Sequence, residues 1–174
     1  MTQVQLPDFR RGEAFEVRSQ SSPWQLADHN VHEARDNKYL GEGILVGIVD
    51  SGVDADHPEL AGRIAGGESF VGRRHGPWNT DYNDHGTWVA GAVASKTFGM
   101  APRSKLFILK ALGSNGVGSS GGVAKPIYAG VEAGCMAMNL SLGGPGIDHA
   151  IRDAILHGKS KGVIFFIAAG NEGG

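Results

Sequence analysis

The sequence contains one cysteine, no long apolar run and no excess of basic residues, and each scarcity excludes a class of protein. Cys135 has no disulfide partner within the chain, and its apolar neighbours favour a small core residue. The longest fully apolar run, residues 163–169, is far shorter than the ~20 residues that a membrane-spanning helix needs. With 16 Lys and Arg against 18 Asp and Glu, the chain has no basic excess for binding phosphates. We therefore expect neither a nucleic-acid nor a membrane partner.

Glycine is abundant instead, since 28 of the 174 residues are glycine, about twice the usual ~7%. The glycines follow no collagen-like period, which predicts turns and loops where the backbone makes close approaches. The polar, irregular stretch of residues 1–23 predicts an N-terminal arm, and residues 24–174 predict one domain of ordinary size. Residues 1–17 lack the apolar stretch of a secretory signal, so the sequence leaves the localisation open.

Short apolar runs alternate with helix-like stretches from residue 43 onward. The predicted strands are 43–49, 105–110, 135–140 and 163–169, and the predicted helices are 84–96, 122–133 and 147–161, with a further helix at 23–38. This alternation predicts an α/β fold with three layers, α/β/α, around a mostly parallel sheet. Sites in such folds form at the carboxyl ends of the strands, and we expect the functional residues at that edge.

Asp50, His85 and Asn171 come from three separate segments that this fold would bring to the same edge. Asp50 directly follows the first strand, His85 begins a helix, and Asn171 lies in a glycine loop after the last strand. Asp84 or Asn83 is the expected N-cap of the histidine helix. A histidine base needs a buried carboxylate that fixes its tautomer, and acyl transfer needs a neutral donor aimed at the developing oxyanion. The three residues therefore predict acyl-transfer chemistry.

Other patterns in the loops are weaker. Residues 116–121 match the GxGxxG pattern of dinucleotide-binding folds, but the next strand does not end in the acidic residue which that fold requires. Residues 118–122 match the GxSxG pattern of α/β-hydrolases, with Ser120 as nucleophile, but the Asp and His residues that follow lie within one helical stretch. The acidic residues and histidine of 54–57 fit no standard metal-binding loop, so we expect no metal site.

Five sequence blocks, taken together, resemble the subtilisin-like serine proteases (subtilases). They are Asp50-Ser51-Gly52-Val53 with His57-Pro58, His85-Gly86-Thr87 with Val89-Ala90-Gly91, Gly99-Met100-Ala101-Pro102, Asn139-Leu140-Ser141-Leu142-Gly143-Gly144, and Ala168-Ala169-Gly170-Asn171-Glu172-Gly173. Their order along the chain is the order found in that family. The resemblance implies a serine endopeptidase in which Asp50 is the triad acid, His85 the general base and Asn171 the side-chain oxyanion donor.

The resemblance also implies a groove for an extended peptide or protein substrate. Its residues are Gly116, Val117 and Gly118, which would pair with the substrate main chain, and Ser141, Leu142 and Gly143, which would line one wall of the pocket for the residue before the scissile bond. Recognition of main chain by main chain implies substrates that are unfolded or flexible.

One family block is absent from the 174 residues. Subtilases carry their nucleophile in a Gly-Thr-Ser-Met-Ala block beyond the oxyanion asparagine, and no such block occurs here. The resemblance therefore implies a subtilase catalytic domain that is incomplete at its C-terminus and inactive alone. The missing part would leave apolar faces uncovered, so we expect a complementary C-terminal segment that carries the serine, or self-association.

The calcium-binding loop of secreted subtilisins is shortened in this sequence. Only residues 92–98 separate Gly91 from Gly99, although Glu59 matches the position of a family ligand. We expect no cofactor, and calcium is the one candidate that the resemblance leaves open.

Three functions remain as hypotheses. The first is an endopeptidase whose serine lies outside this sequence. The second is a non-catalytic subtilase-like module that retains the groove for peptide binding or regulation, and the third is an α/β-hydrolase that uses Ser120. The joint presence of Asp50, His85 and Asn171 favours the first, because binding alone requires neither a base nor an oxyanion donor.

Overall fold

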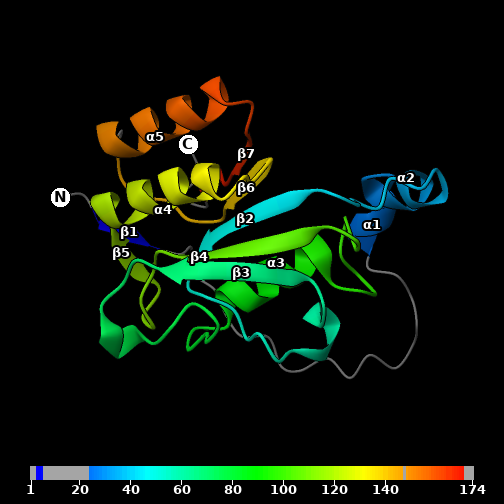
Figure 1. The fold of residues 1–174 in the computed structure, drawn as a ribbon, viewed down its shortest axis with the longest axis horizontal. Coiled ribbons are helices and arrows are strands. Elements are labelled where there is room, and N and C mark those ends of the chain that lie inside the picture. Colours follow the sequence, from blue (N-terminus) through cyan, green and yellow to red (C-terminus); the bar gives the residue numbers. More distant parts are fainter. Residues whose placement is uncertain (1–2, 6–23, 147, 171–174) are drawn as a thin grey trace.

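A five-stranded parallel sheet forms the centre of the molecule (Figure 1). The computed structural model describes residues 3–5, 24–146 and 148–170. In spatial order the strands are β3 (Ile64–Ser69), β4 (Lys105–Lys110), β2 (Leu45–Asp50), β6 (Ala137–Leu140) and β7 (Ile164–Ile167). All neighbouring strands of this sheet run parallel. Because β2 is the middle strand, Asp50 lies at the centre of the carboxyl edge.

Helices cover both faces of this sheet (Figure 1). Helices α4 (Ser120–Glu132) and α5 (His149–Ser160) pack against each other on one face, and α3 (His85–Ala94) packs against β2 and β4 on the other. The predicted three-layer α/β/α architecture with a parallel sheet is therefore confirmed.

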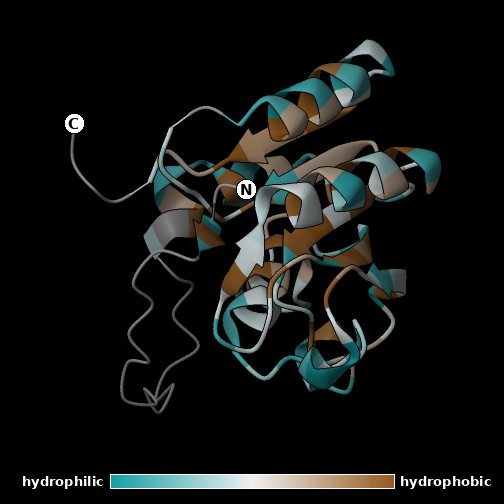
Figure 2. Cartoon of the chain, turned by 90° about the vertical axis from the view of Figure 1, so that its left-hand side faces the viewer, coloured by the Kyte–Doolittle hydropathy of each residue, from teal (hydrophilic) through white to brown (hydrophobic). Residues whose placement is uncertain are grey.

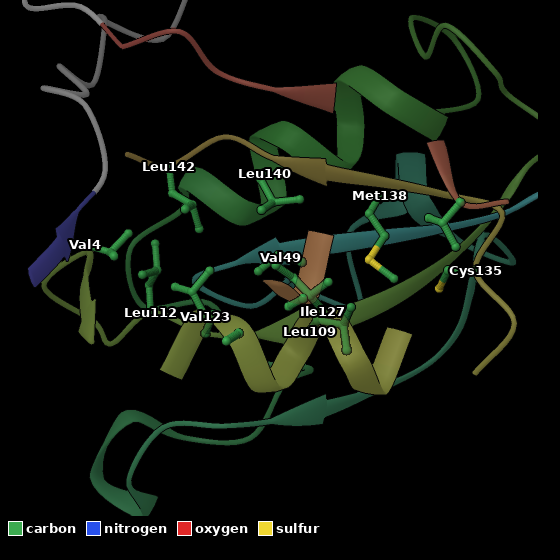
Figure 3. Close-up of a cluster of buried hydrophobic side chains, with 14 residues drawn as sticks. Val4, Val49, Leu109, Leu112, Val123, Ile127, Cys135, Met138, Leu140 and Leu142 are labelled. Atoms are coloured by element: carbon green, nitrogen blue, oxygen red, sulfur yellow. The ribbon is translucent and has the colours of Figure 1, made fainter. Parts of the chain in front are cut away.

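Two apolar clusters hold the layers together. The larger cluster lies between the sheet and α4 and includes Val49 and Ile127, both fully buried (Figure 3). The smaller cluster lies on the α3 face and includes Ile48, Val89 and Leu106. Ile48 and Val49 are neighbours in β2 and serve opposite faces, because side chains alternate along a strand. In Figure 2 the strands are predominantly hydrophobic, whereas the helices carry hydrophilic stretches on their outer surfaces.

Two elements differ from the sequence prediction. The helix predicted at 23–38 is divided into α1 (Trp24–Asp28) and α2 (Val31–Asp36), because Asn30 adopts a left-handed conformation with φ of 54°. Strand β3 was not predicted, since its sequence IAGGES contains two glycines and few β-formers. Pairing with β4 decides its conformation instead.

The N-terminal stretch also contains a strand where the sequence predicts none. Strand β1 (Gln3–Gln5) pairs antiparallel with β5 (Val117–Ser119), and Val4 at its centre is buried. Figure 3 shows the Val4 side chain pointing toward Leu112 in the larger apolar cluster. The predicted surface arm is thus anchored in the core at residues 3–5, and the rest of it, residues 6–23, lies outside the described residues.

Short 3₁₀ turns, η1 (Pro58–Leu60) and η2 (Arg73–His75), complete the described elements. In the part of the chain that the structure describes, no helix has the length and apolarity to cross a lipid bilayer.

Candidate active site

Asp50 and His85 form a buried pair at the carboxyl edge of the sheet. Their side chains are 0% and 5% exposed, and His85 Nδ1 lies 2.9 Å from Asp50 Oδ1 and 3.0 Å from Oδ2. Since the carboxylate can only accept, His85 carries its proton on Nδ1 toward Asp50, which directs Nε2 away from it. In this tautomer the basic lone pair of the imidazole lies on Nε2.

The end of a strand and the start of a helix bring these two side chains together. Asp50 is the last residue of β2, and His85 is the first residue of α3, whose N-terminus meets that strand end. Gly86 permits the close approach, because a Cβ atom there would lie 2.2 Å from the carbonyl oxygen of Gly52. The glycine after the histidine therefore sets the distance between helix and strand.

Burial dominates the electrostatics of Asp50. Desolvation raises the pKa of its carboxyl group, and the hydrogen bonds and charge of His85 together with the Ser51 amide oppose that increase only in part. The amide of Ser51 donates to Asp50 Oδ1 at 2.7 Å. The carboxylate is thus fixed in place by two donors.

Asp84, one of the two expected N-cap residues, occupies the N-cap position of α3. Asp84 precedes the helix in a left-handed conformation, with φ of 72°, and makes no side-chain capping hydrogen bond. The first free amides of the helix are satisfied by residues from elsewhere: Gly86 N donates to Ser51 Oγ at 3.0 Å, and Thr87 N donates to Asp81 Oδ2 at 2.9 Å. Sequence reasoning missed Asp81, although a second carboxylate in the polar loop before His85 was a visible signal.

The predicted substrate groove contains part of the chain itself. Gln5 N donates to Gly143 O at 2.9 Å, and Gly143 N donates to Gln5 O at 3.1 Å, while Val4 pairs with Gly118 on the opposite side. The segment of residues 3–5 thus forms a central strand between Val117–Gly118 and Gly143. These backbone groups can hold an extended peptide.

The remaining residues of the predicted groove lie around this strand. Gly116 closes the turn before β5 with φ of 74°, and Leu142 is buried in the larger apolar cluster. The Ser141 hydroxyl accepts a hydrogen bond from the Asn139 amide at 2.8 Å. An apolar pocket of about 380 Å³ opens beside Val4 and extends along Leu142 to α5.

Two further sequence candidates are Asn171 and Ser120. Asn171 lies outside the described residues. Ser120 is buried as the first residue of α4, and its hydroxyl hydrogen-bonds the Asp148 carboxylate, whose pKa that bond lowers. In the described part of the chain, no hydrogen bond joins this hydroxyl to a histidine, the base that a hydrolase nucleophile needs.

Glu59, the candidate calcium ligand, is occupied by protein donors. Its Oε2 accepts from Thr97 N at 2.8 Å and its Oε1 from Thr97 Oγ1 at 3.0 Å. Both carboxylate oxygens are thus engaged by Thr97, and the described residues contain no group of three His, Cys, Asp or Glu side chains that could hold a metal.

Burial raises the pKa of the Cys135 thiol to about 11. A thiol in that state is protonated near neutral pH and is a poor nucleophile, as expected of a core residue.

The comparisons with known proteins agree with this geometry. The model of the subtilase family matches residues 41–174. The chain belongs to the subtilase family. The matched residues include Asp50, His85, Val117, Gly118, Gly143 and Asn171.

Individual subtilases are similar to this chain over most of its length. The intracellular serine protease of Paenibacillus polymyxa is 36% identical over 144 residues, covering 79% of this chain and 44% of that protein. Subtilisin DY of Bacillus licheniformis is 34% identical over 160 residues, covering 89% of this chain and 57% of that protein. Subtilisin-like protease 3 of Arthroderma benhamiae is 38% identical over 154 residues, covering 81% of this chain and 38% of that protein. The chain spans about half the length of the curated relatives it matches.

Proposed function

We propose that this chain supplies the acid, the base and the substrate groove of a subtilisin-type serine endopeptidase, and that the nucleophilic serine comes from polypeptide outside the 174 residues. The observation that carries the proposal is the buried hydrogen bond between His85 Nδ1 and Asp50. A serine protease needs such a pair, because the carboxylate orients the imidazole and stabilises the imidazolium that forms. Without the serine the chain is inactive as a protease.

The chemistry assigned to each group follows the usual order of acyl transfer. His85 Nε2 takes the proton of the serine hydroxyl while the serine oxygen bonds to the substrate carbonyl carbon and the carbonyl electron pair moves onto its oxygen. The Asn171 amide donates to that oxyanion. His85 then gives the proton to the leaving amine nitrogen as the C–N bond breaks. Water repeats the sequence on the acyl-serine and regenerates the hydroxyl.

The groove supports a substrate in the form of an extended peptide segment. Gly118 pairs with Val4 on one side, and Gly143 exchanges two backbone hydrogen bonds with Gln5 on the other, so main chain is already bound from both sides. Recognition of this kind selects conformation rather than sequence, with side-chain pockets adding preference at alternate positions. Folded proteins would enter only through flexible loops or unfolded segments.

An exposed apolar face supports a complementary partner segment. Phe165 of β7 packs toward Gly158 of α5, so Ile164 and Phe166 project from the opposite face of the sheet, where they are 61% and 59% exposed. Helix α3 packs on that face against β2 and β4. We therefore assign this face, named the β7 face, to polypeptide that carries the serine.

A fluorophosphonate probe tests the endopeptidase proposal, because it reacts only with an activated serine. The chain is incubated with the probe alone and together with any polypeptide that co-purifies with it, and the label is located by mass spectrometry. We expect label on a serine outside this chain, and we expect His85→Ala to abolish it while His157→Ala on the surface of α5 preserves it. Removing a triad histidine costs about 10⁶ in kcat, a magnitude measured on subtilisin itself.

The other outcomes of this experiment separate the competing functions. Label on Ser120 would support the α/β-hydrolase hypothesis. Absence of label in every preparation would support the non-catalytic module and contradict the endopeptidase proposal.

The second candidate function is a peptide-binding module, and the strand of residues 3–5 in the groove favours it. A fluorescent peptide with the sequence of residues 1–7 should bind a chain that lacks residues 1–5 more tightly than it binds the intact chain, because β1 competes for the same backbone groups. Gly118→Ala should weaken that binding, because its Cβ would lie 2.7 Å from the Ala111 carbonyl and displace β5. Gly121→Ala is the matched control, since a Cβ there meets nothing within 4 Å. Equal anisotropy for the intact and shortened chains would contradict this competition.

A further inference from the structure

Four hydrogen-bond donors converge on the carboxylate of Asp81. Ser51 Oγ and Asn83 N donate to Oδ1 at 2.9 and 3.0 Å, while Thr87 N and Thr87 Oγ1 donate to Oδ2 at 2.9 and 2.8 Å. Partial burial disfavours the charge, but these hydrogen bonds outweigh it and hold the pKa of Asp81 below its ordinary value. Because each oxygen accepts two donors, an asparagine amide could satisfy only one half of this arrangement in either orientation.

The donors that Asp81 binds lie next to the catalytic pair on both sides. Ser51 follows Asp50 in the chain, and Thr87 comes two residues after His85. The Ser51 hydroxyl links the two sides directly, since it donates to Asp81 and accepts from Gly86 N at 3.0 Å. Asp81 therefore joins the end of β2 to the first turn of α3.

The segment that contains Asp81 is itself anchored to the sheet. The ammonium of Lys110, at the end of β4, is buried and donates to the Thr80 carbonyl at 2.6 Å. Desolvation lowers the pKa of Lys110, and the negative charge of Asp81 opposes that decrease. Val53 N also donates to Trp78 O at 3.0 Å. The position of Asp81 is thus fixed relative to β2 and β4.

We propose that Asp81 is the positioning residue of the Asp50–His85 pair: through Ser51 and Thr87 it fixes the first turn of α3 against β2, so that His85 Nδ1 faces Asp50. Asp84, at the N-cap position, makes no side-chain capping bond to this helix start. This role rests on the proposed function, in which Asp50 and His85 are the acid and the base. The hydrogen bond between Asp50 and His85 that Asp81 supports is nevertheless present without a serine.

Nuclear magnetic resonance of the His85 ring in the whole 174-residue chain tests this role. In the parent we expect a downfield Nδ1–H proton and ¹⁵N shifts of the Nδ1–H tautomer. In Asp81→Asn we expect a mixture of tautomers and exchange of the Nδ1 proton with water at least about tenfold faster, as the loss of an ordered hydrogen bond to a charged group predicts. A residue that only stabilised the fold would lower the melting temperature without changing the tautomer.

Two further variants keep the test decisive. Thr87→Val removes one of the four donors, and we expect an exchange rate between those of the parent and Asp81→Asn, even if the latter folds poorly. Asp153→Asn removes an exposed carboxylate on α5 and should leave the His85 signals unchanged. The ring signals of His157, which contacts Tyr128 on the far helices, report whether the fold is intact.

The inference is overturned if Asp81→Asn or Thr87→Val folds and retains the parental His85 tautomer and exchange rate. Its failure is distinct from failure of the endopeptidase proposal. If no fluorophosphonate label forms but the His85 tautomer changes in the variants, the protease proposal is rejected and the positioning role of Asp81 is kept. If label forms but the tautomer is unchanged, the protease proposal is kept and the positioning role is rejected.

Discussion

Asp50 is fully buried, and its carboxylate accepts a hydrogen bond from the His85 ring. Desolvation raises the pKa of its carboxyl group above the ordinary value of 3.8, while the imidazole of His85 and the amide of Ser51 stabilise the ionised form. The carboxylate thus orients His85 but is a cost to folding at neutral pH, because burial of a charge is only partly offset by its hydrogen bonds. Function and stability oppose each other at this residue.

Asp50→Asn should therefore raise the unfolding temperature at pH 7. A carboxyl group whose folded pKa is raised contributes full stability below its unfolded pKa and loses that contribution as pH rises through the folded pKa. The gain in melting temperature of the variant over the parent should be smallest near pH 4 and should grow toward neutral pH, as measured by circular dichroism melts. A gain that does not change between pH 4 and pH 8 would contradict this account of Asp50.

The position of helix α3 against the loop after β2 depends on a glycine, which has no side chain. At Gly86 the helix approaches the loop after β2 so closely that no Cβ fits, whereas Gly91 in the same helix faces open space. Both glycines lie in the same helix, but a tertiary contact requires a glycine only at position 86. Helix propensity alone would favour alanine at both positions.

Gly86→Ala and Gly91→Ala form a matched pair for urea denaturation. Gly86→Ala should destabilise the chain by about 1–3 kcal/mol or more, because the new methyl group pushes the helix start away from Gly52. Gly91→Ala should stabilise it by about 0.5–1 kcal/mol, since alanine loses less backbone entropy in a helix. The same sign for both substitutions would show that propensity, rather than the contact at Gly52, dominates at Gly86.

At the scale of the whole molecule, one face of the central sheet is only partly covered by the other described residues. Ile164 and Phe166 of the β7 face are more than half exposed, and β7 pairs only with β6 within the described sheet. Adjacent apolar side chains on an edge strand favour association with another chain or segment. This face is therefore where we propose that the partner expected from the sequence binds.

Ile164→Lys combined with Phe166→Lys should reduce self-association of the isolated chain and its binding of a hydrophobic dye. Two lysines on the β7 face cannot be buried without a charge partner, so contact with another copy becomes unfavourable. Gel filtration and dye fluorescence measure the change, and Tyr39→Lys at an exposed position distant in sequence is the control. A parent chain that is already a compact monomer and binds no dye would contradict the assignment of this face.

The sequence determined the layers of this molecule, because its apolar runs and helical stretches are local patterns with the periods of buried strands and helices. It also predicted the two residues that meet at the sheet edge, since Asp50 ends a strand and His85 begins a helix, and carboxyl ends of parallel strands share one edge. The family membership followed from motifs whose order needs no structure to read.

Only the tertiary structure decided which groups hold those residues in place. The side-chain hydrogen bonds to the first amides of α3 come from Asp81 and Ser51 rather than from Asp84. Strand β3 forms through its pairing with β4, and residues 3–5 become a strand between Gly118 and Gly143. Each of these contacts joins segments distant in the chain, and its strength depends on backbone groups or loop side chains that carry no periodic signal. Local patterns cannot rank such contacts, because their free energies arise only when the sheet has already brought the partners together.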